Sequence, residues 1–181
     1  MIDPKGVGKL EMVCSKDELR PSLMGIRIDA EKKRLIATNG QILVIYPLKE
    51  DEFDEQMTQS ATIPSRVLSE WRKGSKEGKK DYPIFIHGHV SKLESGISFD
   101  HIDEPYPNFE SVIPRESKDL PVKFRIGLRA DLLKQMIAGL KGEQLVFTFF
   151  GASKAVIVQP KDTDEFALIM PFRFWEGFDE P

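Results

Sequence analysis

The chain has 181 residues, 40% of them hydrophobic and 30% charged, which is typical of a soluble globular protein and excludes a disordered tail. Its net charge of −3 excludes bulk electrostatic attraction to nucleic acid or membranes, so any affinity for DNA must come from local basic patches. A single cysteine, Cys14, excludes an intramolecular disulfide and fits a reducing compartment. Because no apolar signal region or bilayer-spanning segment is present, we expect a cytoplasmic protein without membrane contact.

The first predicted elements are a strand, a brief helical turn and three further strands. Residues 10–14 are a predicted strand, and Ser15 followed by Glu18 is a capping-box pattern that opens a helical turn. Alternating apolar and polar residues predict a half-buried strand over 25–30. Asn39-Gly40 lies between two β-branched runs and predicts a type I′ hairpin, whose apolar strands should be covered on both faces.

The same order of elements returns twice. The second copy has a strand at 61–63, a helix that ends at Gly74 and carries Val67, Leu68 and Trp71 on one face, and short strands at 83–87, 89–93 and 97–101. The third copy has an alternating strand at 122–128, a helix from Leu132 to Leu140 closed by Gly142, and strands at 145–150, 154–159 and 165–170.

The chain therefore reads as three β-α-β-β-β units spaced by roughly 50 to 65 residues. This predicts an α+β fold with helices on one face of antiparallel sheets. One such unit cannot cover its own helix and sheet, so two should pair with their helices side by side. We predict a domain of two half-repeats over 1–118, a third half-repeat over 119–175 and a tail over 176–181. The third half-repeat then needs a docking site within the chain or on a second chain.

Three segments resemble motifs of one known family, in the right order. Residues 36–43 are similar to an Ala-Thr-Asp-Gly-His-Arg-Leu hairpin, residues 106–114 to a Pro-Asp-Tyr-x-x-Val-Leu-Pro segment, and residues 168–174 to a C-terminal Val-Met-Pro-Met-Arg-Leu sequence. The chain thus resembles the bacterial sliding clamp, the β subunit of DNA polymerase III, from about residue 10 to residue 174. The likeness implies a DNA-clamp-like fold.

The resemblance implies a complete middle domain followed by the second half of the last domain. The family's first domain, which supplies half of the ring-closing contact, has no counterpart in this sequence. A full ring holds six domains in two chains, and four chains of one and a half domains would also supply six. We therefore expect a homo-oligomer, with a tetramer as the working hypothesis.

The resemblance also implies non-specific binding of duplex DNA through long cationic side chains that reach phosphates. The helix-borne candidates are Arg20, Arg66, Arg72, Lys73, Arg129 and Lys134. Charges on the exposed face of an amphipathic helix are also ordinary solvation, and that alternative stays open. The lysines at 73, 76, 79 and 80 favour a solvated loop.

A second implied function is docking of short linear peptides from polymerases and repair proteins, in a pocket between the middle and last domains. Carried over position by position, the wall of that pocket would include Thr38, Ile42, Leu43, Pro114, Leu168, Ile169, Met170 and Phe172. The same residues would also serve as strand residues of an ordinary core. Gln41-Ile42 stands where the family has His-Arg, which leaves two alternatives, a different peptide preference or a vestigial pocket. Residues 175–181 extend beyond Phe174 and are candidates to cover the pocket.

A metal-binding enzyme is a weaker hypothesis. His87 and His89 stand at i and i+2, with His101, Asp103 and Glu104 nearby in sequence, and two such histidines can share a metal. Gly88 favours a turn that would separate them.

Other enzyme classes have less support in the sequence. Cys14 lies in a predicted strand with no histidine close in sequence, and no phosphate-cradling glycine loop is present. We expect no catalysis and no cofactor. A third possibility is a clamp-fold protein-interaction or inhibitory module that does not bind DNA.

Overall fold

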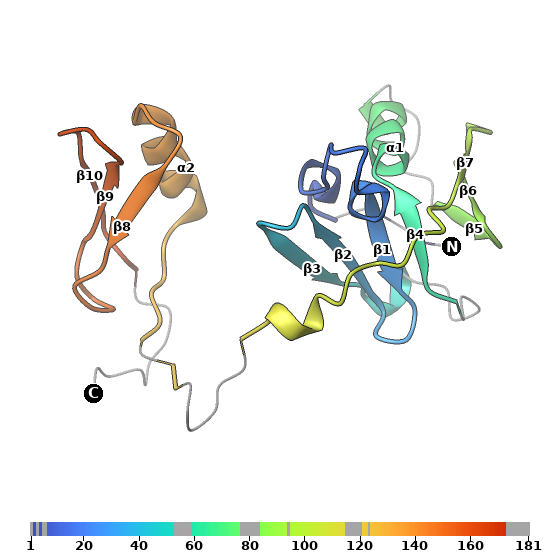
Figure 1. Ribbon diagram of the computed structural model, residues 1–181, viewed down its shortest axis with the longest axis horizontal. Coiled ribbons are helices and arrows are strands. Elements are labelled where there is room, and N and C mark those ends of the chain that lie inside the picture. Colours follow the sequence, from blue (N-terminus) through green and yellow to red (C-terminus); the bar gives the residue numbers. More distant parts are fainter. Residues whose placement is uncertain are drawn as a thin grey trace. The chain divides into compact units, whose positions relative to one another are not determined.

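The computed structural model describes residues 2, 4, 7–52, 59–76, 84–93, 95–114, 121–122 and 124–172, with residues 75–76 as backbone only (Figure 1). The chain divides into two compact units, Met1–Ile113 (unit 1) and Pro114–Pro181 (unit 2). Within the described ranges, no helix is long and apolar enough to cross a membrane. The predicted lysine-rich loop beyond residue 76, the linker at 115–120 and the tail at 176–181 lie outside those ranges.

A four-stranded antiparallel sheet forms the centre of unit 1. Its order is β3-β2-β1-β4, from β1 (Gly25–Asp29), β2 (Arg34–Thr38), β3 (Leu43–Pro47) and β4 (Ala61–Pro64). The alternation predicted for β1 is confirmed, because Ile26 and Ile28 are buried in the core while Arg27 and Asp29 are only half-buried. Successive side chains of a strand point to opposite faces, so the two charged residues lie on the outer face of the sheet.

The second half of unit 1 follows the predicted order of strand, helix and three strands. After β4 come α1 (Arg66–Lys76), β5 (Phe85–His87), β6 (Val90–Lys92) and β7 (Ser98–Asp100), and the last three form a sheet in the order β5-β6-β7. The backbone N–H of Ile102, just after β7, donates to the carbonyl of Thr62 in β4 at 2.8 Å. The two sheets are therefore joined at β4.

Helix α1 covers the core of unit 1. Val67 and Leu68 are buried in it, and Trp71 packs against the same cluster. The predicted stop at Gly74 is wrong, because the helix continues to Lys76. A glycine costs an exposed helix only about 1 kcal/mol relative to alanine, which weakens a helix without ending it.

The hairpin after β2 exists, but its predicted type I′ turn is wrong. Thr38 pairs with Leu43, so four residues form the loop, and only Gly40 among them has a positive φ (+90°). Asn39 instead uses its side chain to hold the loop, as described below. The prediction that both faces are covered holds for β2, which is almost entirely buried, but β3 is only half-buried.

The predicted strand at 10–14 is also wrong. Residues Leu10–Met12 form a 3₁₀ turn, in which the N–H of Val13 donates to the carbonyl of Leu10 at 3.0 Å. The buried Leu10 and Cys14 are four residues apart, a spacing that suits a helical turn better than a strand. The helical turn predicted next is a second 3₁₀ segment, Pro21–Met24, and Ser15 caps no α-helix.

Unit 2 holds α2 (Ala130–Gly139) and a three-stranded antiparallel sheet. The sheet order is β10-β9-β8, from β8 (Leu145–Thr148), β9 (Val156–Pro160) and β10 (Ala167–Ile169). The predicted helix and three strands are confirmed, with α2 ending before Gly142. The core contains three buried hydrophobic residues among those described, Val156, Val158 and Ile169.

The predicted strand at 122–128 does not form a ladder in the described part of unit 2. A backbone hydrogen bond links it to the segment that follows β10, from the N–H of Phe172 to the carbonyl of Gly127 at 2.9 Å. A strand needs a neighbour along its length, and the described residues of unit 2 offer none on the other edge. The complete β-α-β-β-β order is therefore observed only in the second of the three predicted copies.

The contact between β1 and β4 leaves no room at Gly25. A Cβ atom there would lie 2.6 Å from Thr62 Cγ2, 2.7 Å from Ile102 Cδ1 and 2.8 Å from the carbonyl oxygen of Ile63. We predict that Gly25→Ala lowers the free energy of unfolding by about 1–3 kcal/mol, because overpacking a core forces backbone shifts. Urea denaturation followed by far-ultraviolet circular dichroism measures this.

Gly74→Ala is the matched control, because nothing lies within 4 Å of a Cβ atom at that position in α1. It should stabilise the protein by about 0.5–1 kcal/mol through the helix propensity of alanine. Equal effects of the two substitutions would contradict the close approach of β1 and β4.

Candidate functional site

The hairpin loop between β2 and β3 is held by its own side chains. The Thr38 hydroxyl donates to the carbonyl of Ile42 at 2.6 Å and accepts from the N–H of Gly40 at 3.1 Å. Asn39 Oδ1 accepts from the N–H groups of Gln41 and Ile42 at 2.9 and 3.0 Å. The loop is therefore preorganised, and it presents the side chain of Ile42 to solvent while Leu43 stays half-buried.

The last described segment of unit 2 presents apolar side chains in alternation. Leu168, Met170 and Phe172 are all exposed, with Met170 at 66%, whereas Ile169 between them is buried in the core of unit 2. Alternate residues of an extended chain share one face. Ile169 is thus a core residue, and its neighbours form an exposed apolar row. Pro114 is exposed as well.

Most of the predicted phosphate-binding cations already have an acidic neighbour. Arg20 Nε lies 2.8 Å from Asp17 Oδ2, Lys73 Nζ lies 2.6 Å from Glu70 Oε1, and Arg129 Nη2 lies 2.5 Å from Asp131 Oδ2. All three cations are more than half exposed. Solvent-exposed ion pairs contribute little free energy, so a phosphate can compete for these cations.

Arg72 differs, because it holds the N-terminal segment against α1. Its Nε donates to Glu11 Oε1 at 2.8 Å, and its Nη2 donates to the carbonyls of Val7 and Gly8 at 3.0 and 2.7 Å. These contacts give Arg72 a structural role in unit 1. Arg20 is also not helix-borne as predicted, since it precedes the 3₁₀ segment at Pro21–Met24.

The two remaining cations of the predicted set are exposed. Arg66 begins α1, and its guanidinium lies over the ring of Phe99, 5.4 Å from the centroid. Lys134 lies on the exposed surface of α2. The predicted cations are thus distributed over both units, and their role in binding phosphate stays a prediction.

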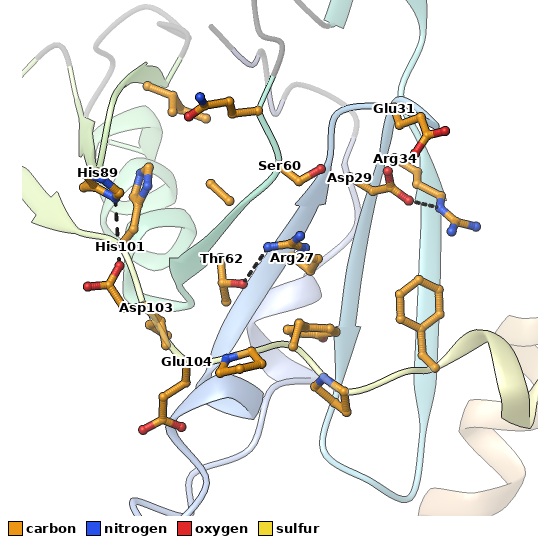
Figure 2. Close-up of a pocket in the computed structure, with 18 of the residues that line it drawn as sticks. Arg27, Asp29, Glu31, Arg34, Ser60, Thr62, His89, His101, Asp103 and Glu104 are labelled. Carbon is orange, nitrogen blue, oxygen red and sulfur yellow. Dashed lines mark hydrogen bonds and ion pairs between the residues drawn. The ribbon is translucent and has the colours of Figure 1, made fainter.

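A cleft of about 800 Å³ lies on the outer face of the sheet in unit 1. Figure 2 shows Arg27 of β1 pointing to Thr62 of β4 across its floor, with Nη1 3.5 Å from Oγ1. The segment 103–110 crosses the sheet as one wall of the cleft (Figure 1), where the Tyr106 hydroxyl donates to the carbonyl of Ile36 at 3.3 Å. Burial raises the pKa of Tyr106 well above its ordinary value, so its hydroxyl stays a donor.

Charged groups fix the end of this crossing segment. The Arg34 guanidinium binds Glu110, donates to Asp29 Oδ2 at 2.8 Å and lies 5.1 Å from the centroid of the Phe109 ring. Lys32 Nζ also reaches Glu110 at 2.7 Å. The hydrogen bond from Arg34, together with that from Lys32, lowers the pKa of Glu110 to about 2. This cluster anchors the segment to β1 and β2.

The histidines do not assemble a metal site. Gly88 has a φ of +55° and forms the turn between β5 and β6, which separates His87 from His89 as its residue type indicates. His89 Nδ1 lies 3.8 Å from Asp103 Oδ1, both side chains being almost fully exposed, and His101 Nε2 lies 2.9 Å from Ser91 Oγ. Burial is the main cause that lowers the pKa of His101. In the described parts of the chain, no three metal-ligating residues come together.

Sequence reasoning missed the cleft and its anchor. The aromatic residues of the 106–114 motif were recognised, but the partner of Glu110 is Arg34, 76 residues away in the chain. The sequence alone does not indicate this ion pair, because the two residues come together only once the sheet has folded. The alternation of Arg27 and Asp29 on the polar face of β1 was the available signal, because it predicted a charged outer face.

Comparisons with known proteins bear on the fold. Neither the family models nor the curated protein sequences compared with this chain match it. Solved structures do match it. The β sliding clamp of Caulobacter crescentus aligns with 94% of this chain and 49% of its own at 18% identity, with a TM-score of 0.66. The DNA polymerase sliding clamp of Bacillus subtilis covers 96% of this chain and 64% of its own at 17% identity, with a TM-score of 0.57.

The sliding clamp of Pseudomonas aeruginosa matches in the same way, covering 96% of this chain and 65% of its own at 16% identity, with a TM-score of 0.52. The chain has the sliding-clamp fold. It spans about half to two thirds of the length of the clamps that it matches. The architecture is α+β, with antiparallel sheets and two α-helices in the described residues. At this identity the likeness shows the fold alone.

The anchor of the crossing segment gives a pH prediction. Because the folded pKa of Glu110 is lowered, its ion pairs stabilise the protein above pH 4.5 and lose that effect as the pH falls toward 2. Arg34→Gln should raise the pKa of Glu110 toward 4.5 and reduce the pH dependence of the free energy of unfolding to the part that Lys32 contributes. Carboxyl chemical shifts in an NMR titration measure the pKa.

Arg20→Gln serves as the control, because it removes an exposed ion pair that does not contact Glu110. The pKa of Glu110 should not change in that variant. An unchanged value in Arg34→Gln would mean that Arg34 is not the dominant partner in solution.

Proposed function

We propose that this chain is a clamp-like scaffold that contacts duplex DNA phosphates without sequence preference and docks short peptides of polymerase or repair partners. The observation that carries the proposal is the exposure of Ile42 on the hairpin loop and of Leu168, Met170 and Phe172 on the last segment. These residues belong to two of the three motifs that resemble the clamp, and contiguous apolar side chains left on a surface mark interaction sites.

The wall of the proposed peptide site comprises Thr38, Ile42, Leu43, Pro114, Leu168, Met170 and Phe172. Ile169 supports it from the core of unit 2. An apolar peptide side chain that fills such a site gains about 25 cal/mol per Å² of buried surface. The preorganised hairpin loop favours binding, because it is already held by the hydrogen bonds of Thr38 and Asn39.

The peptide site is tested by a fluorescent peptide that carries the clamp-binding segment of a bacterial replicative polymerase. We predict that Met170→Asp weakens binding about tenfold or more, since truncating or charging a central apolar contact costs about 1.4 kcal/mol or more. Fluorescence anisotropy measures the dissociation constant. Ile97→Asp is the control, because Ile97 is an exposed apolar residue in the turn between β6 and β7, outside both motifs. Equal binding by wild type and Met170→Asp would remove the site.

The proposed DNA contact relies on Arg66, Lys73, Arg129 and Lys134, with Arg20 as a further candidate. Arg72 is the weakest member of the set, because its donors are used within unit 1. Long cations that reach phosphates release counterions, so binding should weaken as salt rises. The sequence of the duplex should not matter, because phosphate contacts carry no base information.

We predict that replacing Arg66, Lys73, Arg129 and Lys134 together by glutamine makes the negative slope of log Kobs against log salt shallower, by about 0.9 for each phosphate that is no longer neutralised. Anisotropy of a labelled duplex of about 30 base pairs at several salt concentrations gives that slope. Lys154→Gln with Lys161→Gln is the control, because both lysines are exposed in turns of unit 2. Identical slopes for the fourfold variant and wild type would overturn the proposed DNA surface.

The ion pairs favour a second candidate, a clamp-fold protein-interaction or inhibitory module that does not bind DNA. Asp17, Glu70 and Asp131 already neutralise three of the proposed cations, and the chain as a whole is acidic. Peptide binding with no salt-dependent binding of duplex DNA would support this candidate over the first.

We further propose that the protein acts in the cytoplasm without catalysis, as a homo-oligomer and in the simplest arithmetic as a tetramer. The division into two half-repeats over 1–118 and a third over 119–175 belongs to this proposal. Three half-repeats per chain leave one without an internal partner, which is the reason for expecting association.

A further inference from the structure

We propose that unit 2 associates with unit 2 of a second copy of this chain, through the free edge of β8 and the segment 124–128. The inference rests on the proposed homo-oligomer and assigns the surface through which two copies associate. It does not depend on DNA or peptide binding, which are measured separately.

Unit 1 shows how two halves of this fold join. The strand before its helix, β4, pairs antiparallel with β1 of the other half, with Gly25 opposite Pro64 and Ile28 opposite Ala61. At the far end, Ile2 pairs with Ile84 just before β5, so a segment of the first half also borders the sheet of the second. The two halves therefore exchange strand contacts in both directions.

Unit 2 has the counterparts of one half. In unit 1 the backbone N–H of Ile102, after the last strand, donates to the carbonyl of Thr62 in β4. In unit 2 the N–H of Phe172, also after the last strand, donates to the carbonyl of Gly127. The segment before α2 therefore corresponds to β4, with Gly127 in the place of Thr62. The strand after the helix is β5 in unit 1 and β8 in unit 2. In the described part of unit 2, however, β8 is the outer strand of its sheet, and none of the described strands β8, β9 and β10 pairs with residues 124–128.

The helix of unit 2 is uncovered where that of unit 1 is covered. In the alignment fixed by these hydrogen bonds, Leu132 takes the place of Val67, and their exposed fractions are 42% and 0%. Ile137 takes the place of Arg72, whose contacts with the N-terminal segment join α1 to the other half. Ile137 is exposed as well, and no residue of α2 is buried. In unit 1, a second half covers the corresponding face of the helix.

Aromatic residues gather beside the open edge. Phe124, Phe147 and Phe149 are 44%, 36% and 44% exposed. The ring of Phe149 lies 6.0 Å from that of Phe124 and 6.4 Å from that of Phe147, between centroids. Residues 145–150, Leu-Val-Phe-Thr-Phe-Phe, include no charge and no proline. Natural proteins usually protect a free strand edge with charged residues or proline. Because residues 145–150 have neither, this edge is suited to pairing with another strand.

A second copy is the occupant that this arrangement favours. Unit 2 carries counterparts of both members of the strand pair seen in unit 1, the β8 edge and the segment 124–128. A two-fold axis would place the segment of each copy along β8 of the other, which satisfies both edges at once in a closed interface. Because β8 is uncharged, the axis brings no like charges together on that strand. A partner of a different sequence would need both a free strand edge and a free extended segment of its own to pair with the two edges of unit 2.

The test uses the full chain and its solution mass. We expect light scattering to give at least twice the mass of one chain at 50 µM. Phe147→Glu with Phe149→Glu should halve that mass or reduce it to one chain, while circular dichroism stays unchanged. Phe166→Glu is the matched control, because Phe166 is a more exposed phenylalanine of the same unit, adjacent in sequence to β10 at the opposite edge of the sheet. Its mass should equal that of the wild type.

Hydrogen exchange provides a second measurement if the double variant unfolds. In the wild type, amides of 124–128 and 145–148 should be protected at 50 µM and lose protection on dilution, whereas those of β9 stay protected. A monomeric wild type at 50 µM would overturn the inference, as would an oligomer of unchanged mass in the folded double variant. The second result would still leave the proposed homo-oligomer intact through another surface.

Discussion

The antiparallel pairing of β1 with β4 is the interaction on which unit 1 depends. It joins a meander of three strands to a half that contains the helix α1, and the tight approach at Gly25 shows how closely the two backbones lie. The buried residues of the main cluster come from both halves, so neither half could bury them alone. Val67 and Leu68 each gain about 1.5–3 kcal/mol from burial, and that gain exists only because the other half covers them.

The crossing segment 103–110 follows from the same sheet. Ile26 and Ile28 face the core, so Arg27 and Asp29 must face outward, where an uncovered charged sheet would stay in water. The segment returns across that face and fixes itself through Tyr106 and Glu110. One strand thus determines both the core of unit 1 and the position of the chain that leads toward unit 2.

Local patterns of the sequence predicted elements well wherever one face of an element is buried, as the alternation in β1 and the apolar face of α1 show. They failed where the backbone depends on a neighbour that a sequence does not show. Residues 122–128 alternate as a strand should, but a strand exists only with a partner along its edge. Asn39-Gly40 predicted a hairpin correctly and its turn type wrongly, because side chains hold a wider loop. The candidate site has the same limit, since motif likeness identified Met170, while the pairing of Arg34 with Glu110 needed the folded sheet.

Charge and assembly are linked in the function that we propose for this chain. With a net charge of −3 and three candidate cations beside carboxylates, one copy offers few unpaired positive groups to a duplex. Several copies held together would present the same few cations repeatedly, and linked weak contacts bind far more tightly than separate ones. DNA would then stabilise the assembly by the same free energy with which the assembly stabilises DNA binding, because linkage is reciprocal. Under the proposed function, a protein with this composition would therefore hold DNA without a strongly basic surface, provided that the exposed face of unit 2 brings copies together first.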